Sequence, residues 1–134
     1  MTFEHTETAT TTASPDRVWQ IWNDVATWPD WDPSVADARL DGPFEAGTTG
    51  TMTLAGPIEV PLALDVVEPG RRYLDRLTMG ELVIAIDHVV EATPDGSVIT
   101  VSTVISGPGA EGIGPMVTAE APAAIARLIE LAQG

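Results

Sequence analysis

The sequence contains no cysteine and no lysine. Without cysteine the chain has no disulfides, no thiolate nucleophile and no cysteine-based zinc site. Twenty acidic residues face six basic ones, which gives a formal net charge of −14. Binding to nucleic acids and to anionic lipid surfaces depends on clustered cations. We therefore expect no nucleic-acid partner, and we interpret the acidic surface as a source of solubility.

The chain also has few features of secreted or membrane proteins. Its start, MTFEHTETAT, has neither the basic nor the apolar part of a secretory signal. No apolar run approaches the roughly 20 residues that a membrane span requires. We expect a cytoplasmic protein without membrane insertion. Hydrophobic residues make up 44% of the chain, enough for a packed core. The length favours a single domain over residues 1–134.

The N-terminal segment predicts a strand followed by a helix. Residues 3–12 are rich in threonine, and β-branched side chains favour extended backbone. Ser14 suits an N-cap and Pro15 suits the first helical position. Apolar residues then follow at helical spacing, which predicts a helix from Pro15 to about Asp24. The prolines beyond it leave room for at most a short second helix.

The middle of the chain has the pattern of an antiparallel meander. Glycine and proline turns separate short runs rich in β-branched residues. Alternation is clearest from Ile58 to Val66, where every second residue is a large aliphatic. Runs this close together leave no room for the crossovers of a parallel sheet. The predicted strands are residues 35–40, 49–55, 58–67, 72–78, 81–93 and 98–106.

A final helix is predicted from Pro115 to about Ala132, with Ile125 and Leu128 on its apolar stripe. Pro122 would remove a backbone hydrogen bond inside it, so we expect a kink there. The expected fold class is α+β. A curved antiparallel sheet of about seven strands would wrap around this long helix, with one or two short helices after the first strand.

Several segments resemble one protein family in the same order along the chain. Residues 13–32, ASPDRVWQIWNDVATWPDWD, resemble the opening of the polyketide cyclase/dehydrase branch of the START/Bet v 1-like (SRPBCC) superfamily. Residues 41–52, 67–72 and 87–91 continue the resemblance. It implies a helix-grip fold with a hydrophobic cavity between the sheet and the C-terminal helix. Members bind lipids, hormones or aromatic metabolites, and some cyclise polyketide chains. No catalytic constellation is shared across the superfamily, so the resemblance carries no activity.

Few polar residues are candidates for chemistry. His88 alternates with apolar residues of its strand. If that face lines a cavity, His88 could orient a ligand carbonyl or move a proton; a core histidine bonded to the backbone is the commoner outcome. Arg76 could reach inward to a carboxylate or an enolate, although an exposed ion pair is commoner. Asp75 is expected to face water. His88 and Arg76 are the catalytic candidates, and the residues leave open whether a reaction occurs.

The remaining histidine, His5, is expected at the surface of the first strand. No spacing of ligand residues suggests a metal site, and no motif suggests a cofactor. Trp19 and Trp22 are expected to pack the first helix against the sheet. Trp28 and Trp31 follow it, and each is either a core residue or a cavity wall. The residues expected to contact a ligand are Trp28, Trp31, Met52, Leu62, Leu64, Ile84, Ile86, His88, Val101, Met116 and Ile125.

Three functional hypotheses follow. The first is a protein that binds a small hydrophobic or aromatic metabolite in an internal cavity. The second is an active polyketide cyclase or dehydratase, in which the cavity folds the substrate and His88 assists enolisation. The third is a protein-interaction module of the helix-grip type. The expected partner is a small hydrophobic molecule, and the expected assembly is a monomer or a homodimer.

Overall fold

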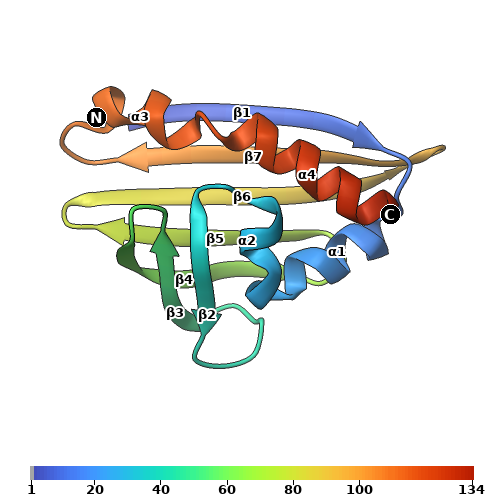
Figure 1. Ribbon diagram of the computed structural model, residues 1–134, viewed down its shortest axis with the longest axis horizontal. Coiled ribbons are helices and arrows are strands. Elements are labelled where there is room, and N and C mark those ends of the chain that lie inside the picture. Colours follow the sequence, from blue (N-terminus) through green and yellow to red (C-terminus); the bar gives the residue numbers. More distant parts are fainter. Residues whose placement is uncertain (1) are drawn as a thin grey trace.

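The computed structural model of the protein describes residues 2–134. Its centre is a seven-stranded sheet with the strand order β1-β7-β6-β5-β4-β3-β2. Every neighbouring pair is antiparallel, and helices lie across one face of the sheet (Figure 1). The expected α+β class is confirmed. The strands are β1 (Thr2–Thr11), β2 (Val35–Leu40), β3 (Thr49–Leu54), β4 (Ile58–Glu68), β5 (Arg72–Met79), β6 (Leu82–Thr93) and β7 (Gly96–Ser106).

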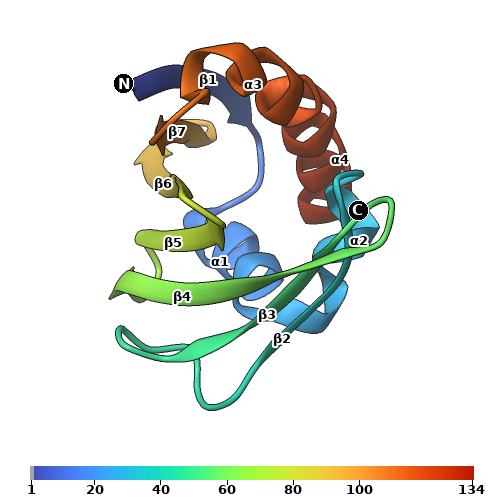
Figure 2. The same ribbon diagram turned by 90° about the vertical axis from the view of Figure 1, so that its left-hand side faces the viewer.

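The sheet is strongly curved. Figure 2 shows its strands in an arc, with α3 and α4 across the open side. Register shifts interrupt two strand pairs, between Val35 and Asp37 in β2 and between Leu64 and Val66 in β4. Such bulges bend a strand and increase its local twist. The arc gives the sheet a concave face, and the helices cover that face.

The first helix forms where the sequence predicts it. Helix α1 (Pro15–Asn23) begins after Ser14, whose Oγ accepts a hydrogen bond of 3.2 Å from the backbone N–H of Arg17. A single 3₁₀ turn, η1 (Val25–Thr27), and a short helix, α2 (Trp28–Trp31), follow. The indole N–H of Trp28 donates to the backbone carbonyl of Trp22 at 2.9 Å. This bond ties α2 to the end of α1.

The C-terminal helix differs from the prediction in its boundaries. Helix α3 (Ala110–Thr118) begins before Pro115 and contains it, and α4 (Ala121–Gln133) follows after a short break. The predicted kink at Pro122 is wrong, because Pro122 lies in the first turn of α4. A proline there loses no hydrogen bond, since the first N–H groups of a helix have no partner within it. Within residues 2–134, no helix is both long and apolar enough to cross a membrane.

Helix α3 packs closely on β1 at one glycine. A Cβ atom on Gly114 would lie 2.2 Å from Cγ of the Phe3 ring, whereas one on Gly112 would meet nothing within 4 Å. We expect Gly114→Ala to lower the free energy of unfolding by about 1–3 kcal/mol through overpacking. Gly112→Ala is the matched control, and it should raise stability by up to about 1 kcal/mol through helix propensity. Urea denaturation of both variants is the measurement; equal effects would contradict the packing.

Candidate functional site

A cavity of about 590 Å³ lies between the concave face of the sheet and the helices. Ligand pockets in proteins begin at about 300 Å³, so this space is large enough for a small molecule. Its walls come from α1, α2, the strands β2 to β7, and the helices α3 and α4. Most of the lining is apolar. The hydrophobic cavity that the family resemblance implies is therefore present in the structure.

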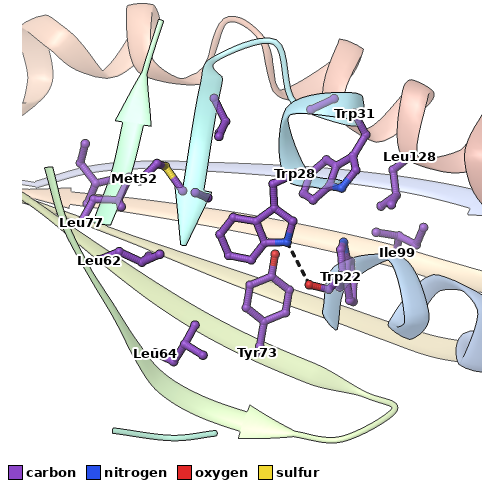
Figure 3. Close-up of a cluster of buried hydrophobic side chains, with 14 of the residues drawn as sticks. Trp22, Trp28, Trp31, Met52, Leu62, Leu64, Tyr73, Leu77, Ile99 and Leu128 are labelled. Atoms are coloured by element: carbon purple, nitrogen blue, oxygen red, sulfur yellow. Dashed lines mark hydrogen bonds between the residues drawn. The ribbon is translucent and has the colours of Figure 1, made fainter. Parts of the chain in front are cut away.

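Most of the predicted ligand contacts border this cavity. Trp28, Trp31, Met52, Ile84, Ile86, His88, Val101, Met116 and Ile125 all line it. Leu62 and Leu64 do not, although both are buried on the inner face of β4. In Figure 3 they lie below Met52 and Leu77. Alternation along a strand assigns a residue to a face, but it does not show which neighbours cover the side chain.

Two charged residues of β5 lie on opposite faces of the sheet, Arg76 in the exposed ion pair that was the commoner expectation and Asp75 on the face opposite to the expected one. Arg76 points away from the cavity and forms a bidentate ion pair with Asp65, with Nε–Oδ2 and Nη2–Oδ1 distances of 2.9 and 3.2 Å. Its candidate role inside the cavity is wrong. Asp75 was expected to face water, but only 2% of it is exposed and it lines the cavity. Period-two alternation with Tyr73 and Leu77, both buried, is the signal that places Asp75 inward.

Asp75 is an uncharged acid at neutral pH. Burial, together with the nearby negative charge of Asp32, raises the pKa of its carboxyl to about 8. Its Oδ1 atom has no hydrogen-bond partner among the described residues. A carboxylic acid of this kind keeps its proton and can donate a hydrogen bond. The inner face of β5 therefore presents a neutral donor to a mostly apolar space.

Asp32, at the end of α2, is a second acid on the cavity wall. Burial raises the pKa of its carboxyl, while hydrogen bonds from Ser34 oppose this effect. The Oδ1 atom accepts from the Ser34 backbone N–H at 3.0 Å and from its hydroxyl at 2.7 Å. Asp32 therefore has partners within its own turn, which Asp75 lacks.

Tyr73 is the centre of an aromatic cluster behind the cavity. Its ring stacks on His88 with a centroid distance of 4.0 Å and an angle of 6°, and on Trp28 at 5.8 Å and 22°. Phe44 and Trp22 contact it edge-on at 5.3 and 5.5 Å. Figure 3 shows Tyr73 reaching from the sheet toward Trp28. Ring pairs in such geometries stabilise the packing beyond the burial of their area.

The sequence left two interpretations of His88 open, a residue of the cavity wall and a core residue bonded to the backbone, and both describe it. Its Nδ1 atom lies 3.3 Å from the backbone carbonyl oxygen of Tyr73 on the neighbouring strand. A carbonyl only accepts, so Nδ1 carries the proton of this hydrogen bond. The residue also lines the cavity. Burial lowers the pKa of the imidazole to about 4, which keeps it neutral at pH 7.

His5 lies elsewhere, on β1, where its Nε2 atom is 2.8 Å from Oε1 of Glu7. It is therefore not part of the cavity. Across residues 2–134, no group of three or more histidine or acidic side chains is placed to hold a metal ion.

Across residues 2–134, the cavity is lined by acidic side chains and by no arginine. Asp32, Asp75 and Glu120 line it, and none of the arginines of the described chain does. Two large apolar residues that border the cavity are exposed, Ile58 by 50% and Met116 by 75%. They come from the start of β4 and from α3. We infer that the opening lies between these two elements.

Sequence reasoning missed several lining residues. They include Asp75, Asp32, Tyr73 and Trp22, the last of which was expected only to pack α1. Trp22 packs the helix and borders the cavity at once, since it is fully buried between α1 and Tyr73. Helical periodicity could identify its buried face, but not the space beyond it.

Comparisons with known proteins agree with this architecture. The crystal structure of Ara h 8.0201 matches over 99% of both chains, with a TM-score of 0.79 and 16% identity. The di-domain ARO/CYC StfQ from the steffimycin biosynthetic pathway covers 99% of this chain and 51% of its own, with a TM-score of 0.83 and 10% identity. A truncated norcoclaurine synthase from Thalictrum flavum matches over 98% of this chain and 93% of its own, with a TM-score of 0.77 and 19% identity.

At these identities the structural likeness shows the fold alone. The search of curated proteins gave no match. The family assignment comes from the sequence itself, because the family model described as polyketide cyclase / dehydrase and lipid transport matches residues 2–133. The chain therefore belongs to the polyketide cyclase/dehydrase and lipid transport family.

Proposed function

We propose that this protein binds a small hydrophobic, aromatic metabolite inside the cavity. The observation that carries the proposal is a space of about 590 Å³ bordered by Trp22, Trp28, Trp31 and Tyr73. Flat rings offer a large apolar contact area and favour other rings as neighbours. Ligand sites are typically apolar hollows of this size with a few polar groups. Membership in a family of small-molecule binding proteins supports the same function.

Two measurements test this proposal. Native mass spectrometry of freshly purified protein should show a co-purified small molecule in part of the sample. Titration with 2-acetylnaphthalene should quench tryptophan fluorescence, because Trp22, Trp28 and Trp31 border the cavity. Saturable quenching supports an accessible site, and its absence contradicts one.

Filling the cavity should abolish this binding. Thr103 on β7 is buried and lines the cavity, so Thr103→Phe is expected to weaken binding of 2-acetylnaphthalene by more than tenfold. The next residue, Ser102, lies on the other face of β7, where its hydroxyl meets Thr6. Ser102→Phe is the matched control and should leave affinity unchanged. Equal affinities of the two variants would show that the probe binds outside the cavity.

A second candidate function is catalysis of cyclisation or dehydration by His88. It is favoured by one observation, a neutral imidazole on the cavity wall. A neutral imidazole can accept a proton from the carbon next to a carbonyl group. Incubation of the wild-type protein with a synthetic aromatic β-diketone, followed by mass spectrometry for loss of water, separates the two functions. Turnover supports the enzyme, and binding without turnover supports the carrier.

A further inference from the structure

The unpartnered polar atoms of the core all belong to residues that line one cavity. Among the side chains of residues 2–134, three buried polar atoms lack a hydrogen-bond partner: Trp22 Nε1, Trp31 Nε1 and Asp75 Oδ1. All three residues border the 590 Å³ space. An unsatisfied buried polar group costs about 1–3 kcal/mol, and such groups are rare in native proteins. Their gathering at one place points to a bound partner.

These three groups share one hydrogen-bonding character. An indole N–H only donates. The buried Asp75 carboxyl keeps its proton at neutral pH, so it donates as well. Asp75 lies in register with Leu64 on one side and Ile86 on the other. Neither aliphatic neighbour can accept its proton. A ligand that forms hydrogen bonds with these donors must therefore carry an acceptor, such as the oxygen of a ketone, a quinone or an ester.

The charges around the cavity exclude a second class of ligand. Asp32 and Glu120 border it, and every arginine of the described chain lies outside it. A buried carboxylate needs a cation or several strong donors to offset its desolvation. Two acids on the wall add repulsion to that cost. Fatty acids and other carboxylates are therefore poor ligands for this site.

We propose, on the basis of the ligand-binding function above, that Asp75 determines specificity by donating a hydrogen bond to a carbonyl oxygen of an uncharged aromatic ligand. Trp22 on α1 and Trp31 on α2 border the same cavity, and their indole N–H groups supply further donors. Hydrocarbons without an acceptor leave these groups unpartnered, and anionic ligands meet no positive charge.

Three probes of similar size test this inference at pH 7: naphthalene, 2-acetylnaphthalene and 2-naphthoate. Tryptophan quenching gives their affinities for the wild-type protein. We expect the ketone to bind about tenfold or more tightly than naphthalene, the size of effect that one hydrogen bond gives. We expect 2-naphthoate to bind most weakly.

Two variants of Asp75 isolate the role of its carboxyl. Asp75→Leu has a similar shape without a polar group, so the preference for the ketone should fall to about onefold. Asp75→Asn keeps an N–H donor and should retain most of the preference. Arg76→Leu is the control on the outer face of β5, and the preference should not change. Circular dichroism of each variant confirms its fold.

The outcomes separate this inference from the proposed function. If the wild-type protein binds none of the three probes, the ligand-binding function itself fails. If it binds naphthalene as tightly as the ketone, or prefers 2-naphthoate, the cavity binds ligands but the specificity proposed here is wrong. A preference for the ketone that survives in Asp75→Leu would remove Asp75 as the donor.

Discussion

Replacing Asp75 with asparagine is expected to stabilise the protein on the alkaline side by a large margin. The pKa of the Asp75 carboxyl is about 8 in the folded protein, against an ordinary value of 3.8. At a pH between these two pKa values, the folded chain keeps the proton on the Asp75 carboxyl, whereas the unfolded chain releases it. The contribution of Asp75 to the stability of the wild-type protein therefore falls as the pH rises from about 4 to about 8, and it levels off above the folded pKa.

An amide at this position does not titrate, so the variant lacks this loss. Each pKa unit corresponds to about 1.4 kcal/mol, so the stability difference between Asp75→Asn and wild type should change by roughly 5 kcal/mol between pH 4 and pH 9. Urea denaturation across this range gives the difference directly. Asp32, Tyr73, His88 and Glu120 border the same cavity, and Asp65 also acts on the carboxyl. All five residues are present in both the wild-type protein and Asp75→Asn, so the comparison isolates the change at position 75.

A difference that stays constant with pH would show that water reaches Asp75 and that its carboxyl titrates normally. This outcome would also weaken the case for Asp75 as a neutral donor to a ligand.

Truncation of Tyr73 should produce the second large effect. Tyr73→Ala removes a fully buried ring that contacts His88, Trp28, Phe44 and Trp22. Truncating a buried aromatic residue to alanine costs about 3–5 kcal/mol, so we expect a loss of that size in urea denaturation. The loss should come from the ring, because no hydrogen bond of the hydroxyl is needed for the stacking.

Tyr73→Phe is the matched control, since it keeps the ring and removes only the hydroxyl. We expect it to retain most of the stability. A loss below about 1 kcal/mol in Tyr73→Ala would mean that the cluster rearranges and closes the gap. Similar losses in both variants would assign the stability to the hydroxyl instead of the ring.

The sequence predicted the sheet well because turns and alternation are local signals. Every predicted strand is present, and the helix from Pro15 forms as Ser14 and Pro15 indicate. The C-terminal helix was less predictable. A proline in a helical pattern fits either a kink or a new first turn, and Pro122 takes the second role because the chain breaks just before it.

For the candidate site, the sequence predicted which face of the sheet a side chain lies on, but not whether that side chain borders the cavity. Alternation assigned His88 and Ile86 to the inner surface, and the structure places both at the cavity. It also assigned Leu62 inward, and Leu62 is buried there but does not line the cavity. Asp75 was misassigned because an acid usually faces water, although its position between Tyr73 and Leu77 indicates the inner face. Burial of an acid depends on tertiary packing, which no local pattern reports.

The stacking of His88 on Tyr73 has a consequence for any kinetic study of this protein. Removing the imidazole also removes a ring partner at 4.0 Å and a contact with the Tyr73 carbonyl. A lower rate in an alanine variant would combine lost proton transfer with a displaced tyrosine. A double-mutant cycle over the two positions can separate these contributions, because it measures the coupling energy of the pair.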